Sequence, residues 1–161
     1  MQSDPIGLDG GINSYKYSNN SPLNYFDSNG KLFQWLSDLF VPTITFSRAE
    51  LPHVSLTIIT GFGKGHPNVL TKCSLCATTN RRAAFKAASI GGSANELARF
   101  LGWVGNWSWD EYPFASTNEG GAGAVVLPVP ARENSVQGGK LSVFYRQNSL
   151  QDGDRFKVNV K

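Results

Sequence analysis

Apolar residues are spaced differently in the first thirty residues and in the rest of the chain. Residues 1–30 are rich in Gly, Asn, Ser, Pro and Tyr, with turn signals every few positions, and alone they could not bury a core. In residues 32–40, Leu and Phe recur at helical spacing and Pro42 would stop the helix, so we expect a short linker helix. The run HVSLTIIT at residues 53–60 is apolar and β-branched, which predicts a buried strand.

Two segments in the middle of the chain have the pattern of helices. They are residues 78–92 and residues 93–103, with Gly91 and Gly92 as the break between them. Residues 78–80 and Ser93 are the candidate N-caps, because Thr, Asn and Ser side chains accept hydrogen bonds from the first helical N–H groups.

The C-terminal third predicts strands. Residues 122–130 form an apolar run limited by its prolines, and residues 154–160 alternate apolar and polar positions with period 2. Residues 137–147 follow a Gly turn and fit either a helix or a strand. We therefore expect an α+β fold, with a small mixed or antiparallel sheet and helices on one side.

Charged residues are distributed unevenly along the 161-residue chain. Residues 1–60 have 3 Lys and Arg against 5 Asp and Glu, a net charge of −2, whereas residues 61–161 have 12 against 7, a net charge of +5. A basic C-terminal part is attracted to polyanions such as nucleic acid, although a solvated surface explains the same balance. No apolar run approaches the ~20 residues that span a bilayer, and the start lacks the pattern of a secretory signal, so we expect a soluble protein without a membrane partner.

The two cysteines, Cys73 and Cys76, form a C-x-x-C pair. A zinc site would need two more ligands, and His53 and His66 are the whole histidine supply. Two free thiols or a local disulfide in a loop is the simpler interpretation.

A group of acids and bases could perform hydrolysis of a phosphodiester. Such a reaction needs ligands for a hard divalent cation, a base for the attacking water and cations for the phosphate. The first two needs could be met by Asp110, Glu111, Glu119, Glu133 and Asn134, and the third by Arg81, Arg82, Arg132 and Lys140. Spacing alone leaves the other interpretation open, in which adjacent carboxylates begin a helix or lie in a solvated turn.

The first thirty residues resemble the end of the core of Rhs/YD-repeat proteins. The pattern is roughly DPxGxxxGxNxYxYxxNNPxNxxDPxG, and the positions that fall on it in order are Asp4, Pro5, Gly7, Gly11, Asn13, Tyr15, Tyr17, Asn20, Pro22, Asn24, Asp27 and Gly30. The resemblance implies that residues 1–30 close a large β-structured shell and that a toxin follows them. Together with the helical pattern described above, it leads us to expect a linker with a short helix at residues 31–50 and the toxin domain at residues 51–161. The chain departs from the pattern at FDSNG, where a second DPxG is usual.

Residues from about 64 to 160 resemble the NucA/NucB deoxyribonucleases. The motifs GHPNVLT, NRRAA, DEYPFAS, EGG with a following GA strand, and PAREN occur in the family's order. This resemblance implies a ββα-metal type of nuclease site, in which two strands and a helix hold one divalent ion, Mg²⁺ or Mn²⁺, against the scissile phosphate. SVQGGK replaces the family's RGAGS turn, which places Gln137 there as a candidate substrate contact.

The resemblance implies roles for individual residues. Asp110 matches the general base, and Glu111 would orient it or an arginine. Asn134 is the expected metal ligand, because a neutral amide oxygen binds the ion without repelling phosphate, and Glu119 would bind directly or through water. His66 matches the GHP position, where it would contact substrate or close a loop through a structural hydrogen bond.

Together the two resemblances imply a secreted antibacterial effector whose C-terminal toxin is a metal-dependent, non-specific DNA endonuclease. It would leave the producing cell as part of a larger Rhs protein and act in the cytoplasm of the target cell. Its partners would be DNA, the Rhs shell and an acidic immunity protein that covers the site. The alternatives are an RNase toxin and a nucleic-acid-binding module without catalysis.

Overall fold

The computed structural model describes residues 40–161, of which Pro42–Lys161 form one compact unit. The Rhs-like residues 1–30 and nearly all of the expected linker helix at residues 32–40 lie outside the described residues. The described part is an α+β fold with two small sheets, which confirms the predicted fold class. Within it, no helix is long and apolar enough to cross a membrane.

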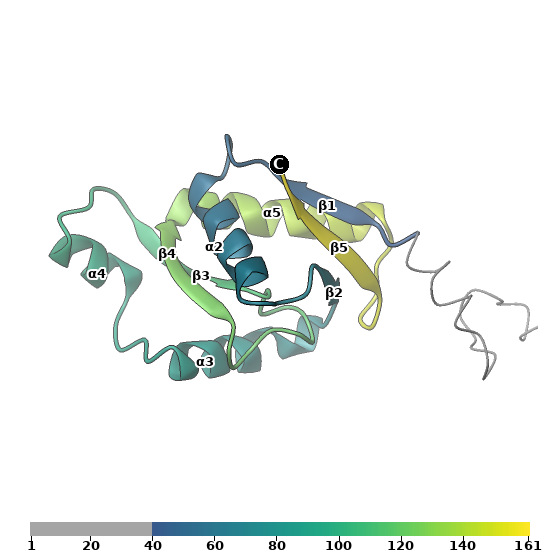
Figure 1. Ribbon diagram of the computed structural model, residues 1–161, viewed down its shortest axis with the longest axis horizontal. Coiled ribbons are helices and arrows are strands. Elements are labelled where there is room, and N and C mark those ends of the chain that lie inside the picture. Colours follow the sequence, from purple (N-terminus) through teal and green to yellow (C-terminus); the bar gives the residue numbers. More distant parts are fainter. Residues whose placement is uncertain (1–39) are drawn as a thin grey trace, which may run out of the picture. The chain divides into compact units, whose positions relative to one another are not determined.

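The larger sheet has three strands in the order β1-β5-β2 (Figure 1). β1 (Thr43–Phe46) runs parallel to β5 (Arg155–Val160), and β2 (Val69–Thr71) runs antiparallel to it, so the sheet is mixed. β5 has the predicted period of 2, with Phe156 and Val158 in the core and the intervening residues exposed. β1 is a strand within the residues 31–50 that the sequence analysis assigned to a linker.

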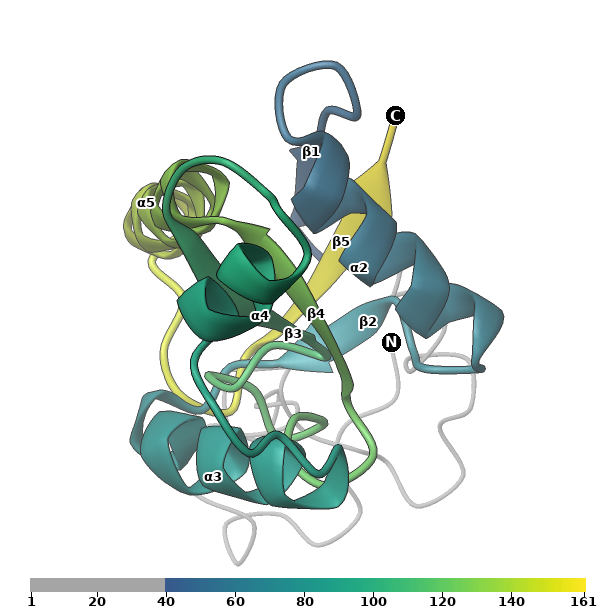
Figure 2. The same ribbon diagram turned by 90° about the vertical axis from the view of Figure 1, so that its left-hand side faces the viewer.

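The smaller sheet is an antiparallel hairpin of β3 (Trp107–Tyr112) and β4 (Val125–Pro130). β4 confirms the strand predicted at residues 122–130, and its prolines at 128 and 130 are tolerated because a two-stranded sheet has a free edge. α5 (Ala131–Gln147) follows directly, so two strands and a helix run consecutively in the chain. The hairpin lies between α5 and α3 (Ala77–Ala87) in both views (Figures 1 and 2).

The strand predicted at residues 53–60 is wrong, because this segment lies in the helix α2 (Pro52–Gly63). Pro52 occupies the first turn, where its missing N–H costs nothing, and the buried residues recur at helical spacing. Burial of Val54 and Ile58 in the core outweighs the β preference of their branched side chains. At Gly61 a Cβ would collide with the Tyr112 ring, so glycine permits α2 to approach β3 closely.

The remaining helices settle the open boundaries. α5 resolves residues 137–147 as helix and begins before them, so the predicted Gly turn is wrong and Gly138 and Gly139 lie mid-helix. α4 (Ala94–Phe100) begins at the predicted cap Ser93, which forms a capping box with Glu96. α3 begins earlier than expected, at Ala77 after the short 3₁₀ turn η3 (Ser74–Cys76), so residues 78–80 are inside the helix.

Candidate active site

A cleft of about 390 Å³ lies where β3, α3 and α5 meet. Its walls come from α3, from one face of α5, from the segment after β3 and from Lys72 after β2. The residues lining it are Lys72, Ala77, Arg81, Asp110, Glu111, Phe114, Ala115, Ser116, Asn134, Gln137, Gly138, Leu141, Ser142, Tyr145 and Arg146. Five of the residues proposed from the sequence are therefore brought together, namely Arg81, Asp110, Glu111, Asn134 and Gln137.

Asp110 is a buried carboxyl, with only 3% of its surface exposed. Burial and, to a lesser extent, the neighbouring charge of Glu111 raise its pKa from 3.8 to about 7. Gln137 and Thr57 lie beside the carboxyl and favour its ionised form, but they have a smaller effect. Its oxygen Oδ2 has no hydrogen-bond partner, which leaves this atom available to a ligand in the cleft.

Glu111 is equally buried, but an arginine supports it. The Arg81 Nε donates to the Glu111 Oε1 at 2.9 Å, and this ion pair opposes the rise in the Glu111 pKa that burial causes. The Arg81 side chain stays 57% exposed, so its remaining N–H groups can still bind an anion in the cleft.

Two amide side chains from α5 border the carboxyl pair. The Asn134 Nδ2 donates to the Ser108 Oγ at 2.9 Å and to the Trp109 carbonyl at 3.2 Å. Because a carbonyl can only accept, these bonds fix the amide orientation and leave the Asn134 oxygen as the atom free for coordination. Gln137 is 4% exposed, and its Nε2 donor is buried without a partner.

These residues fit a hard divalent cation. Mg²⁺ and Mn²⁺ prefer oxygen ligands and commonly use one or two carboxylates together with water. The buried Glu111 carboxylate and the Asn134 oxygen form such a set, and Asp110 lines the same cleft with its Oδ2 unpartnered. Within residues 40–161 no group of three or more His, Cys, Asp and Glu side chains could hold a metal, so a cation bound at this cleft would also need amide or water oxygens.

His66 and Glu119, both proposed from the sequence as catalytic, do not line the cleft. The His66 Nε2 hydrogen-bonds with the Gly123 carbonyl at 3.0 Å, which is the loop-closing contact considered for it. The Glu119 Oε2 accepts from the Thr71 backbone N–H at 2.8 Å and so ties the EGG turn to β2. The structure gives both residues structural contacts, and their catalytic roles stay predictions.

Three of the expected phosphate-binding cations also lie outside the cleft lining. Arg82 is exposed on α3, and Arg132 lines a separate hollow beside the start of α2. The Lys140 ammonium pairs with Glu50 at 3.0 Å. Among the cations proposed from the sequence, Arg81 alone lines the cleft.

Glu133 has a structural partner that sequence spacing did not predict. Its Oε2 accepts from the backbone N–H groups of His53 at 2.9 Å and Val54 at 3.2 Å, and its Oε1 lies 2.7 Å from the His53 Nδ1. The carboxylate therefore caps α2 from the first turn of α5, where negative charge is favourable. This contact holds the helix that supplies Asn134 against the core.

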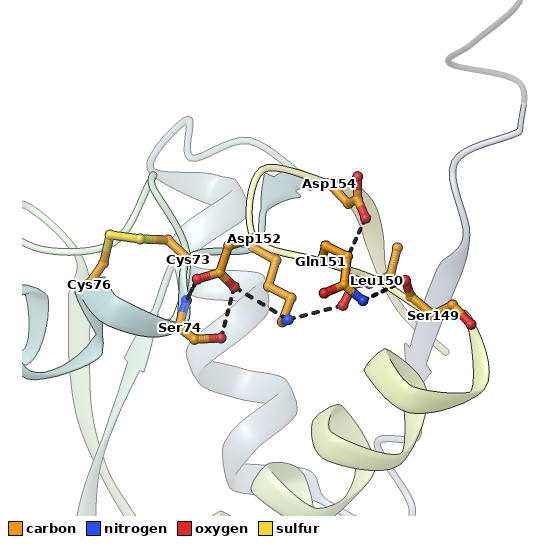
Figure 3. Close-up of polar contacts among 9 residues, drawn as sticks. Cys73, Ser74, Cys76, Ser149, Leu150, Gln151, Asp152 and Asp154 are labelled. Carbon is orange, nitrogen blue, oxygen red and sulfur yellow. Dashed lines mark hydrogen bonds and ion pairs between the residues drawn. A yellow bond between two sulfur atoms is a disulfide. The ribbon is translucent and has the colours of Figure 1, made fainter. Parts of the chain in front are cut away.

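The two cysteines form a disulfide, so their sulfurs are not free to bind zinc (Figure 3). Ser74, between them, donates from its N–H and its hydroxyl to the Asp152 carboxylate at 3.0 and 2.9 Å. This loop leads from Lys72 into α3, and both contribute to the cleft wall.

Comparison with known families decides the identity. The family model described as deoxyribonuclease NucA/NucB matches residues 59–159, which span α3, the hairpin, α5 and every residue that lines the cleft. The chain belongs to the NucA/NucB deoxyribonuclease family. None of the curated proteins matches it. As a NucA/NucB protein it is a DNA nuclease. The prediction of a deoxyribonuclease from the sequence is therefore confirmed at the level of the family.

Sequence reasoning missed the end of the cleft formed by Lys72, Tyr145 and Arg146. The available signal was helical spacing, because Tyr145 and Arg146 lie on the same face of α5 as Asn134 and Gln137. The expected Gly turn and the choice left open between helix and strand for residues 137–147 hid this signal.

Proposed function

We propose that this NucA/NucB chain is a metal-dependent, non-specific DNA endonuclease in which Asp110 is the general base. The observation that carries the proposal is the buried Asp110 carboxyl, whose Oδ2 has no partner, in a residue that lines a cleft with Arg81 on its wall. A base is most effective when its pKa lies near the working pH, and burial raises the pKa of Asp110 to about 7. An ordinary surface aspartate would be a much weaker proton acceptor.

Glu111 and the Asn134 oxygen, together with water, would hold the divalent ion, which leaves Asp110 to act as the base. When bound, such an ion supplies positive charge to the phosphate oxygens and to the leaving oxygen. Asp110 accepts the proton of the attacking water through Oδ2. Arg81 binds a non-bridging phosphate oxygen with the N–H groups that Glu111 does not use, and Glu111 holds the guanidinium in place.

Gln137 supports the same step as a donor. Its Nε2 is buried, unpartnered and close enough to favour the Asp110 anion. The amide donates to the carboxylate or to a phosphate oxygen once the cleft is filled. A buried donor without a partner costs on the order of 1–3 kcal/mol, which a bound substrate can recover.

The test is a nuclease assay with supercoiled plasmid DNA and total RNA, each with Mg²⁺, Mn²⁺ or EDTA. The proposal expects DNA to be cut with either metal, EDTA to stop the reaction, and cleavage to show little dependence on base sequence. Cleavage of RNA alone would support the RNase alternative. Binding without cleavage under every condition would support the non-catalytic module, and DNA cleavage that continues in EDTA would contradict the metal requirement.

We further propose that the nuclease is the toxin of an Rhs effector. This rests on the resemblance of residues 1–30 to the end of the Rhs core and on the basic residues 61–161. The producer would secrete it within a larger protein, an acidic immunity protein would cover the cleft, and killing would occur in the target-cell cytoplasm. Expression of residues 31–161 in a bacterial cytoplasm should degrade its DNA, and growth without DNA loss would contradict the effector role.

A further inference from the structure

The cleft extends well beyond the residues proposed for chemistry. The face of α5 that lines it runs from Asn134 to Arg146. At about 1.5 Å per residue this face is roughly 18 Å long, which exceeds the size of a single phosphate group. The end beside Arg146 is therefore remote from the Asn134 end, and a molecule that fills the whole cleft would contact the two ends with different parts.

Tyr145 supplies an unpartnered donor at this remote end. Its hydroxyl oxygen is buried without a hydrogen-bond partner, and its ring packs edge-on against Phe156 at a centroid distance of 5.3 Å. Burial also raises the pKa of Tyr145 to about 12, and the nearby Ser116 side chain, which lacks hydrogen-bond geometry, opposes this rise only in part, so the hydroxyl keeps its proton at any working pH. A fixed, protonated and unsatisfied hydroxyl in a cleft is a site for an acceptor atom.

Two cations, Lys72 and Arg146, line the cleft together with Tyr145. The Lys72 ammonium donates to the Leu150 carbonyl at 3.0 Å, pairs with Asp152 at 3.3 Å and lies 5.5 Å from the centroid of the Tyr145 ring. These contacts fix the position of the Lys72 ammonium, and the ion pair with Asp152 partly neutralises its charge. Arg146 is exposed at the cleft and forms no salt bridge with any residue of the range 40–161.

We propose that Tyr145 and Arg146, supported by Lys72, form a second phosphate-binding subsite that holds the nucleic-acid backbone several nucleotides from the bond being cut. A phosphodiester offers two non-bridging oxygens, which suit one guanidinium and one hydroxyl donor. The two acidic residues that line the cleft, Asp110 and Glu111, come from β3 and belong to the reacting end. The subsite rests on the proposed function, because it assigns the same cleft to a polynucleotide.

The subsite predicts that substrate length matters. Steady-state cleavage is measured on a ladder of DNA duplexes of increasing length with wild-type protein, Arg146→Gln and Tyr145→Phe. We expect the KM of both variants to rise relative to wild type as the duplex lengthens, reaching roughly tenfold, the loss typical of one hydrogen bond to a charged group. kcat on long duplexes should change little, because the reacting end is intact.

Arg99→Gln is the matched control, since Arg99 is exposed on α4 and lies outside the cleft lining. It removes the same charge and should shift KM equally at every length. Near-UV circular dichroism checks that each variant folds. If Arg146→Gln and Arg99→Gln have the same effect at all lengths, the subsite is overturned and Arg146 contributes only general charge.

A binding measurement separates this proposal from the proposed chemistry. Fluorescence anisotropy of a labelled long duplex in EDTA measures binding without cleavage. Arg146→Gln should reduce the slope of log affinity against log salt concentration by the amount expected for about one phosphate contact. An unchanged salt slope would refute the subsite even in an active enzyme. Absence of DNA cleavage by wild-type protein would refute the proposed chemistry, while a reduced slope would still support the subsite.

Discussion

Replacing Asp110 with Asn should stabilise the protein at neutral pH while it removes activity. The side chain keeps its shape, but it can no longer ionise in a site that is 3% exposed. The rise in the Asp110 pKa from 3.8 to about 7 corresponds to roughly 4 kcal/mol, at about 1.4 kcal/mol per pKa unit. That free energy is the cost of holding a buried charge at the active site.

The sign of the effect follows from proton linkage. Since the folded state binds the Asp110 proton more tightly than the unfolded state, its contribution to stability is full below about pH 4 and is lost as pH rises through about 7. The Asp110→Asn variant cannot ionise at this position, so it does not lose this stability as the pH rises. The difference in free energy of unfolding between variant and wild type should therefore grow by about 1.4 kcal/mol per pH unit between those limits and level off above them.

Urea unfolding of the full-length proteins in EDTA, at pH values from 5 to 8, measures this difference directly. The subtraction cancels titrations that both proteins share, and Asp154→Asn controls for loss of one negative charge at an exposed position. A difference that is constant across this pH range would refute the reasoning. It would mean that Asp110 is ionised in the folded protein no less readily than in the unfolded chain.

Other outcomes follow from the same contacts. Asn134→Ala should weaken metal binding, so that raised Mn²⁺ partly restores cleavage; a metal titration identical to wild type would exclude Asn134 as a ligand. Glu133→Gln should lose the ionic part of the α2 cap and the His53 contact. Urea unfolding should then show a free energy of unfolding lower by about 1 kcal/mol. A variant of unchanged stability that no longer cleaves DNA would instead indicate that Glu133 is catalytic. A chain that starts at Lys31 should cut plasmid DNA at the full-length rate, and a folded but inactive fragment would show that residues 1–30 contribute to the reaction.

Part of the fold could be predicted from the sequence because local signals and packing agreed. Ser93 was the expected N-cap, and α4 begins there, with a capping box to Glu96 that strengthens the same signal. The period-2 pattern of β5 matched a strand with one buried face. In α2 the local pattern and the packing disagreed. A short run of branched apolar residues fits either a strand or a buried helix, and only packing against β3, β4 and α5 makes this segment a helix.

The candidate site was predictable where short motifs carried it and not where distant segments meet. Asp110, Glu111 and Arg81 were found by motif, and the ion pair that joins the last two crosses thirty positions of sequence. The rest of the cleft wall comes from α5, where the pair Gly138 and Gly139 had the sequence pattern of a turn. Treating that helix as a turn separated Asn134 from Tyr145 and Arg146, which share one face in the structure.

The central claim is that a buried Asp110 acts as the base in metal-dependent DNA cleavage, and single-turnover cleavage tests it most directly. Wild-type and Asp110→Asn proteins, matched for fold by circular dichroism, are compared on plasmid DNA with saturating Mn²⁺. Loss of a general base typically costs on the order of 10²–10⁴ in rate, so the variant should be slower by that factor at every Mn²⁺ concentration. Cleavage by folded Asp110→Asn at the wild-type rate would contradict the account.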